Sequence, residues 1–172
     1  MTLSIIVLGL VTVQRLGELV LANHNTRQLM ARGGVETGAG HYPIIVILHA
    51  AWLAGLWLLA WDRPTNLPLL TIFIALQLAR VWVIATLGDR WTTRIITLPG
   101  ADLVRRGPYR FVSHPNYLVV AAEIAVLPLT FGLVGFAVLF SILNAAVLWV
   151  RIRSEGRALV SASEDVLGTP MV

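Results

Sequence analysis

The sequence predicts an all-α integral membrane protein with about five transmembrane helices in one domain, residues 1–172. Of the 172 residues, 57% are hydrophobic and only 13% are charged, whereas an ordinary soluble domain is about 25% charged. A helix needs roughly 20 mostly apolar residues to cross a bilayer, so about five spans use nearly the whole chain. Lipid, not water, is therefore expected to surround most of this protein.

The apolar runs place the expected spans at about residues 3–22, 43–61, 67–87, 117–131 and 133–150. The first run lacks a basic leader and contains Arg15 and Glu18, so we interpret it as a retained span, not as a signal peptide. Glycines mark residues 23–41 as a loop, with room for a short helix at its start. The tryptophans lie mostly near span ends, as in an interfacial belt.

The second and third spans form a hairpin around the polar turn at residues 62–66. The longest polar segment, residues 88–116, precedes the fourth span. The apolar run from 117 to 150 is too long for one span, so we expect two short spans broken near residues 130–132. The tail, residues 151–172, is polar and begins as a predicted surface helix.

The arginines indicate the orientation in the membrane. Five spans place the first and third connections and the tail on one side, and those segments contain ten arginines against Arg63 alone on the other side. Positively charged loops stay cytoplasmic, so we expect a multi-pass protein of the cell membrane with its N-terminus outside and its tail inside. Nucleic acid is not expected as a partner, because no soluble module carries a basic face.

Two missing residue types exclude several chemistries. The chain has no cysteine, which excludes disulfides, thiolate metal sites and a cysteine nucleophile. All of its basic side chains other than histidine are arginines, so lysine nucleophiles and Schiff bases are excluded as well. We expect no metal site.

Five ionisable residues fall inside the expected spans: Arg15, Glu18, His49, Arg80 and Glu123. Such groups are costly in lipid, so each is a candidate functional residue. Arg15 and Glu18 lie three apart on one helical face, and we interpret them as a structural ion pair between neighbouring spans. We interpret His49 as making a hydrogen bond between helices. A functional site is the alternative in both cases.

The densest group of hydrogen-bonding and aromatic side chains is residues 105–117, RRGPYRFVSHPNY, followed six residues later by Glu123. The Gly-Pro pair at 107–108 and Pro115 fix sharp turns, which leave backbone donors and acceptors for a polar ligand. Three side chains have the chemistry to stack on or bond to a purine and a ribose: Tyr109, His114 and Tyr117. The residues alone leave open whether this segment is a structured interfacial loop or a ligand site.

A second pair lies where the last span leaves the membrane. Arg151 and Glu155 are one helical turn apart, and by themselves they are an ordinary surface ion pair, worth about 1 kcal/mol or less. However, the last two spans form a hairpin whose outer ends lie on the same side. The pair is therefore expected to meet residues 105–117, so that one site can use both.

Taken together, these features resemble those of the isoprenylcysteine carboxyl methyltransferase superfamily: the string GPYRFVSHPNY, a glutamate shortly after it, a two-span hairpin, and Arg-x-x-x-Glu with a leucine four residues later. The resemblance implies a multi-span enzyme that uses S-adenosylmethionine. Residues 15–19, 25–36, 40–42, 49, 91–94 and 98–100 resemble a bacterial branch more closely. That branch is often associated with type III polyketide synthases, which implies methylation of alkylpyrones or alkylresorcinols.

By motif position, the resemblance places the cofactor contacts on Ala101, Asp102, Leu103, Val104, Tyr109, His114, Pro115, Asn116, Tyr117 and Glu155. Its substrate-side arginine falls on Arg151. The implied cofactor site is cytoplasmic, formed by the loop before the fourth span and the C-terminal helix. The chain departs from the family pattern in two places: Gly156 stands where a second glutamate is usual, and a longer tyrosine-containing tail is expected but absent. These departures leave the covering of the cofactor and the level of activity open.

The implied reaction is an in-line displacement at a sulfonium, in which positioning supplies most of the catalysis. We expect Arg151 to hold an anionic acceptor while the residues around His114 and Glu155 seat the cofactor. For a neutral phenol, His114 or Glu123 is the nearest candidate base. A neutral, hydrogen-bonded structural role is the alternative for Glu123. A long alkyl or prenyl chain is expected to enter from the bilayer.

The leading hypothesis is therefore a membrane O-methyltransferase acting on a lipidic polyketide, with a functional link to a type III polyketide synthase. Carboxyl methylation of a prenylated cysteine is the second hypothesis, and methylation of a lipid amine is the third. From a different class, a small transporter subunit or a non-enzymatic scaffold remains the alternative. Transporters usually show internal repeats and broken helices, which this sequence lacks, and a scaffold has no reason to bind S-adenosylmethionine.

Overall fold

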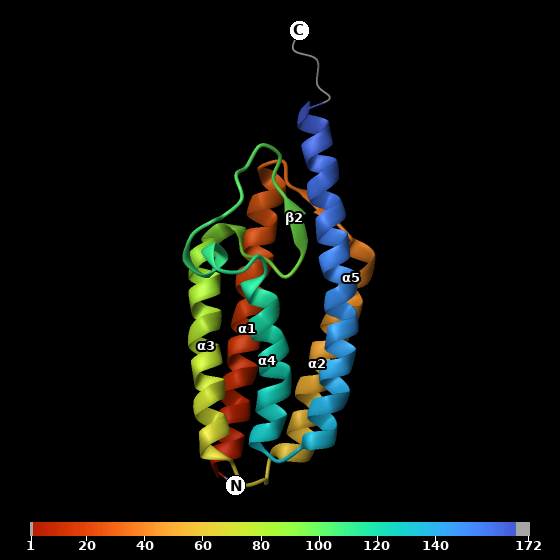
Figure 1. Ribbon diagram of the computed structural model, residues 1–172. Helices are drawn as coiled ribbons and strands as arrows, with labels where there is room; N and C mark the ends of the chain where they lie inside the picture. The colour runs from red at the N-terminus through yellow and green to blue at the C-terminus, as the bar shows by residue number, and fades with distance from the viewer. Residues whose placement is uncertain (1, 168–172) are drawn as a thin grey trace.

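The computed structural model describes the backbone of residues 2–167 and the side chains of residues 3–40 and 42–154. Within this part, five α-helices run along the bundle: α1 (Thr2–Ala31), α2 (Tyr42–Ala60), α3 (Leu67–Leu87), α4 (Pro115–Thr130) and α5 (Val134–Leu167). Three short 3-10 helices, η1 (Ala39–His41), η2 (Gly88–Arg90) and η3 (Gly107–Arg110), lie in the connections. The fold is the predicted all-α membrane bundle (Figure 1).

Four of the helices are long and apolar enough to cross a membrane, namely α1, α2, α3 and α5. The fourth, α4, is apolar but has only 16 residues. At about 1.5 Å per residue it spans roughly 24 Å, less than the roughly 30 Å of a hydrocarbon core. A helix this short brings the polar residues at its start toward the membrane.

One of the expected boundaries is wrong, because the first helix continues through residues 23–31, where a loop was expected. The expected helix at the start of the tail is present, and it continues α5 without a break. In both places the composition changes from apolar to polar, which marks where the chain leaves lipid, not where the helix ends. Asn25 anchors the extension of α1, because its side-chain amide donates to the carbonyls of Gly88 and Trp91 at 3.0 and 2.8 Å.

The structure also contains a small antiparallel ribbon that was not predicted from the sequence. Strands β1 (Val35–Thr37) and β2 (Ile95–Thr97) pair with Glu36 opposite Ile96. Arg94 reinforces the ribbon, because one of its nitrogens donates to both carboxylate oxygens of Glu36, at 2.9 and 3.0 Å. The ribbon ties the first connection to the third at one end of the bundle, where the outer part of α5 also lies (Figure 1).

The expected break between the last two spans is confirmed. Helix α4 ends at Thr130 and α5 begins at Val134. Gly132 has a φ of 71°, a left-handed conformation that favours glycine. The amides of Gly132 and Leu133 close the turn by donating to the carbonyls of Leu129 and Pro128, each at 3.0 Å.

The core is an apolar column between the helices, away from the lipid-facing surfaces. Its most completely buried large side chains are those of Leu8, Trp52, Leu56, Ile124, Leu127 and Phe131. The expected tryptophan belt holds only in part. Trp61, Trp82 and Trp149 are exposed, but Trp52 and Trp91 are each 1% exposed and pack inside the protein. A large apolar ring fills a helix junction as readily as it lies at an interface.

Candidate functional site

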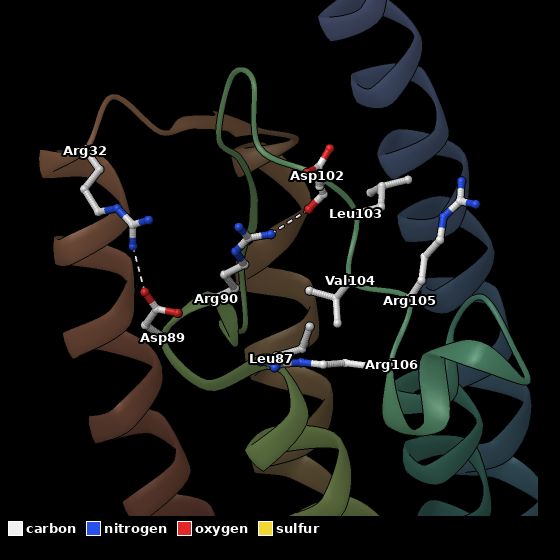
Figure 2. A pocket seen from close by; sticks show the side chains of 9 residues that line it. All are labelled: Arg32, Leu87, Asp89, Arg90, Asp102, Leu103, Val104, Arg105 and Arg106. Atoms are coloured by element: carbon white, nitrogen blue, oxygen red, sulfur yellow. Dashed lines mark hydrogen bonds and ion pairs between the residues drawn. The ribbon is translucent and has the colours of Figure 1, made fainter.

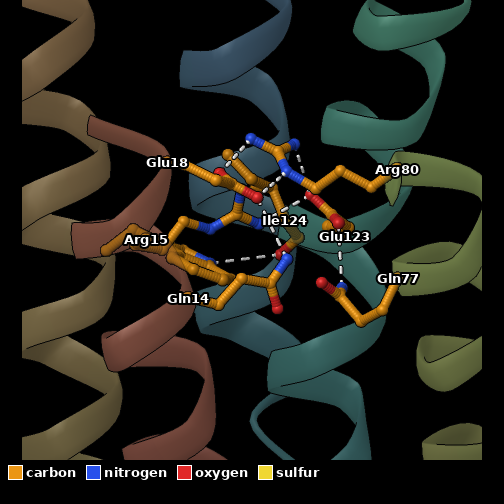
Figure 3. Close-up of polar contacts among 8 residues, drawn as sticks. Gln14, Arg15, Glu18, Gln77, Arg80, Glu123 and Ile124 are labelled. Atoms are coloured by element: carbon orange, nitrogen blue, oxygen red, sulfur yellow. Dashed lines mark hydrogen bonds and ion pairs between the residues drawn. The ribbon is translucent and has the colours of Figure 1, made fainter. Parts of the chain in front are cut away.

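Two groups of polar side chains are candidates for a site. The first is the buried ion cluster, which consists of four charged and two amide side chains from α1, α3 and α4 (Figure 3): Gln14, Arg15, Glu18, Gln77, Arg80 and Glu123. Arg80 holds the cluster together. Its guanidinium donates to both carboxylate oxygens of Glu18, at 2.5 and 2.6 Å, and to Glu123 at 3.1 Å.

Arg15 completes the cluster by donating to Glu18 at 3.0 Å and to Glu123 at 2.7 Å. The expected ion pairing of Arg15 and Glu18 with neighbouring spans is thus present, and it involves α3 and α4. Two arginines balance two glutamates, so the cluster is neutral overall. This balance is what makes four buried charges tolerable in a membrane-spanning bundle.

The cluster also accounts for Glu123, which is 1% exposed. Its two carboxylate oxygens accept from Arg15 and Arg80 and from the Gln77 amide, which lies at 2.8 Å. These bonds come from α1 and α3, so Glu123 joins three helices through its side chain. The geometry therefore favours the structural interpretation of Glu123.

His49 does not make the expected bond between helices. Its Nδ1–H donates to the carbonyl of Ile45, one turn earlier in α2, at 2.8 Å. This bond lies within α2, and no bond from His49 to another span is seen among the described residues.

The second group lies at the ribbon end of the bundle, where η3 approaches α3. Gly107 has a φ of 56°, and a Cβ atom built on it would lie 2.5 Å from the Thr86 hydroxyl. Only glycine therefore fits at this contact. Pro108 follows at the first turn of η3 and is buried. The contact fixes the segment that enters α4.

Helix α4 begins at this position with Pro115 at its first turn, and His114 is the N-cap residue. The rings of His114 and Tyr117 stack, with centroids 5.2 Å apart and an interplanar angle of 14°. Asn116 lies between them in sequence, and its Oδ1 is buried without a hydrogen-bond partner among the described residues. An aromatic stack beside a buried acceptor is suited to a flat heterocycle with polar substituents.

Arg151 of α5 reaches this group and is 9% exposed. Its Nε donates to the Tyr117 hydroxyl at 2.9 Å, and its Nη1 donates to the Thr93 carbonyl at 2.8 Å. The expectation that the start of α4 meets the end of the last span is thus confirmed. No carboxylate among the described side chains pairs with Arg151.

The remaining expected cofactor residues lie in the segment before η3. Asp102, Leu103 and Val104 line a cavity of about 450 Å³ at the ends of α1 and α3 (Figure 2), and Ala101 is half-buried beside them. Arg90 fixes this segment, because its Nη1 donates to the carbonyl of Asp102 at 2.6 Å. These four residues thus form an anchored backbone segment at the end of the bundle where α4 begins.

Two expected site residues need separate comment. Tyr109 lies in η3 and is half-buried, directly after the glycine contact with α3. Glu155 lies in α5, one residue past the side chains that the structure describes. The carbonyl of Thr93, which orients Arg151, was not predicted from the sequence. Backbone groups leave no mark on residue identity, so only the resemblance at residues 91–94 drew attention to this place.

Comparison with known proteins shows the family of this chain. A model of the isoprenylcysteine carboxyl methyltransferase (ICMT) family matches residues 69–161, which include α4, Arg151 and the segment before η3. The chain is 36% identical to the uncharacterized protein YpbQ of Bacillus subtilis over 159 residues, which cover 90% of this chain and 95% of the relative.

A second relative is an uncharacterized protein of Haemophilus influenzae, 24% identical over 61% of this chain and 64% of its own length. No solved structure matches the chain. The family match covers more than half of the chain and contains the motif pair around His114 and Arg151. The chain therefore belongs to the ICMT family, whose members are membrane methyltransferases that in general use S-adenosylmethionine.

Proposed function

We propose that this membrane methyltransferase transfers a methyl group from S-adenosylmethionine to an oxygen of a lipophilic acceptor at the ribbon end of the bundle. The observation that carries the proposal is Arg151. Its guanidinium is buried and oriented by two hydrogen bonds, to the Tyr117 hydroxyl and the Thr93 carbonyl. A guanidinium held in a fixed orientation is suited to bind an anionic acceptor through its other N–H donors.

The residues present fit the cofactor. The His114–Tyr117 stack offers a flat surface for an adenine ring, and the buried Asn116 Oδ1 offers an acceptor for an amine or hydroxyl hydrogen. Segment 101–104 supplies backbone donors and acceptors in a fixed position. These residues, with Tyr109, Pro115 and Glu155, are the proposed cofactor contacts. When bound, S-adenosylmethionine would supply a methyl group activated by its sulfonium.

The residues of the chain do the positioning. A guanidinium has five N–H donors, and the bonds to Tyr117 and Thr93 occupy two of them. The donors that remain on Arg151 can hold an acceptor oxyanion by charge-assisted bonds. Because Tyr117 both stacks with His114 and accepts from Arg151, the acceptor and the cofactor share one rigid support. Such alignment can supply several kilocalories per mole of the barrier reduction.

The need for a base depends on the acceptor. A carboxylate or an acidic hydroxypyrone is already ionised at neutral pH and needs none. A phenol must lose its proton, and His114 is the proposed acceptor of that proton, because Glu123 is occupied by two arginines in the buried ion cluster. His114 is the N-cap residue of α4, and its ring stacks with Tyr117, whose hydroxyl positions Arg151.

We propose a type III polyketide product, an alkylpyrone or alkylresorcinol, as the acceptor, with a functional link to the synthase that makes it. The likeness of the N-terminal half to the polyketide-associated branch supports this choice. A prenylated cysteine carboxylate is the alternative, and it would use Arg151 in the same way. In both cases a long apolar chain would reach the site from the bilayer.

The proposed orientation places the site in the cytoplasm, with the N-terminus outside. The first connection, the third connection and the outer part of α5 lie together at one end of the bundle, and these segments contain most of the arginines (Figure 1). Positive loops favour the cytoplasmic side, where S-adenosylmethionine is available.

Methyl transfer to defined acceptors tests the proposal. The purified protein in lipid nanodiscs is given S-adenosylmethionine labelled in its methyl group and, separately, an alkylpyrone, an alkylresorcinol and a prenylcysteine. We expect labelled product from at least one acceptor, and loss of that product in Arg151→Ala with cofactor binding retained. Equal loss of turnover and cofactor binding would contradict the role of Arg151. A folded protein that neither binds the cofactor nor labels any acceptor would instead favour a scaffold or transporter subunit.

A further inference from the structure

We propose that the cavity beside segment 101–106 binds the phosphate of an anionic phospholipid headgroup. This interfacial cavity has a volume of about 450 Å³ and lies between the end of α1, the end of α3 and segment 101–106 (Figure 2). Its size falls within the roughly 300–1,000 Å³ typical of small-molecule sites. Four arginines and two aspartates line it: Arg32, Asp89, Arg90, Asp102, Arg105 and Arg106.

The charges in the cavity do not cancel. Arg32 pairs with Asp89 at 2.7 Å, which neutralises one arginine. Arg90 donates to the carbonyl of Asp102, so this bond leaves its charge in place. Four arginines against two aspartates leave a formal excess of two positive charges. An anion is therefore the ligand that this lining favours.

Arg105 and Arg106 carry the excess. Neither forms an ion pair with a described carboxylate, and the hydrogen bond of Arg106 to the Thr86 carbonyl is long, at 3.5 Å. Figure 2 shows the two side chains leaving the segment in different directions, with Arg106 toward Leu87 and Arg105 toward α5. The Arg106 guanidinium thus points into the cavity, where an anion can reach it, while Arg105 adds positive charge from the other side of the segment.

The apolar part of the lining indicates a lipid, not a free anion. Leu87, Leu103 and Val104 line the same cavity, and Leu103 is 63% exposed. The candidate span that contains α3 ends at Arg90, so the cavity lies where the chain leaves the membrane. A phosphate beside arginines, with the start of its acyl chains against leucine, satisfies both parts of the lining. Inorganic phosphate would leave the apolar part unused.

The lipid would also regulate the enzyme, and this consequence rests on the proposed function. Segment 101–104 separates the interfacial cavity from the face toward α5 (Figure 2), and its backbone carries proposed cofactor contacts. A headgroup bound in the cavity beside Arg106 would hold this segment in place. Cofactor affinity should then rise when anionic lipid is present.

Native mass spectrometry of the full-length protein tests the binding step directly. The wild type, Arg105→Gln/Arg106→Gln and a control, Arg27→Gln/Arg110→Gln, are released from micelles containing equal amounts of phosphatidylglycerol and phosphatidylcholine. The control removes the same charge from arginines that do not line the cavity. We expect the wild type and the control to retain phosphatidylglycerol, and the test variant to bind it about tenfold more weakly.

Equal retention of phosphatidylglycerol by all three proteins would overturn the proposal, and so would equal loss in the control and the test variant. Phosphatidylcholine retention and helix content should be unchanged in the test variant, which shows that it is folded. Displacement of phosphatidylglycerol by millimolar inorganic phosphate would also overturn the lipid assignment. Retention without any change in S-adenosylmethionine affinity would remove only the regulatory step and leave the lipid site standing.

Discussion

Replacing Arg80 by methionine should destabilise the protein strongly, because the change breaks the neutrality of the buried ion cluster. Arg80 makes three hydrogen bonds to two carboxylates, and its side chain is only 7% exposed. Removing it leaves Glu18 and Glu123 with Arg15 as their single cation. Removing one partner of a buried ion pair typically costs about 3–5 kcal/mol. For a protein of this size that cost lowers Tm by roughly 6–20 °C.

Thermal unfolding in detergent micelles, followed by circular dichroism, measures this shift. Arg32→Met is the matched control, because Arg32 pairs with Asp89 while both side chains are about half exposed. An exposed pair is worth about 1 kcal/mol or less, so the control should melt within a few degrees of the wild type.

A double variant separates loss of balance from loss of packing. Arg80→Met with Glu18→Gln removes one charge of each sign and leaves the 2.7 Å pair of Arg15 with Glu123. We expect the double variant to melt above Arg80→Met alone, because coupled residues are not additive. If Arg80→Met melts like the control, or if the double variant melts below the single one, charge balance in the buried ion cluster does not stabilise the protein.

Three further predictions concern the proposed site. Tyr117→Phe keeps the ring stack but removes the hydroxyl that accepts from Arg151; the KM for the acceptor should rise about fivefold to tenfold with cofactor affinity unchanged, as steady-state kinetics and calorimetry can show. Gly107→Ala should lower Tm by several degrees more than Gly100→Ala. Both glycines have positive φ, but only the Cβ atom added at residue 107 would collide with Thr86. Asn116→Leu should weaken cofactor binding without lowering Tm, because the buried Oδ1 has no partner among the side chains and backbone groups that the structure describes; a variant that loses Tm but keeps cofactor affinity would contradict this.

Hydropathy predicted the helices well because lipid imposes a strong rule on composition. The turn at 62–66 and the break near 130–132 were found, since a polar or glycine-containing interruption between two apolar runs is typical of a turn between spans. The same rule failed at residues 23–31. There the helix continues into a polar environment, and composition reports the solvent without reporting the hydrogen bonding of the backbone.

The tertiary partners of individual residues were less predictable. Arg15 and Glu18 were recognised as a pair from their spacing, but the bonds of Glu18 to Arg80 and of Arg15 to Glu123 join residues 62 and 108 positions apart. No local pattern encodes such distances. The ribbon was missed for a related reason, because each strand has only three residues and the pairing joins two distant loops.

For the candidate site, the sequence motif identified the residues, and the structure shows which of them contact one another. The expectation that residues 105–117 meet Arg151 followed from hairpin topology and is confirmed by the bond to Tyr117. The stack of His114 on Tyr117, the anchoring carbonyl of Thr93 and the buried oxygen of Asn116 depend on side-chain rotamers and backbone position. These features are beyond the reach of a one-dimensional pattern.

We propose that the ribbon end of the bundle binds S-adenosylmethionine. Calorimetry on the detergent-purified protein measures this directly, with S-adenosylhomocysteine, the demethylated product, as the ligand. The wild type should bind with micromolar affinity, and binding should be lost in His114→Ala and Glu155→Ala but kept in Arg63→Ala, at the opposite end of the bundle. Failure of the folded wild type to bind, or equal binding by all four proteins, would contradict the account.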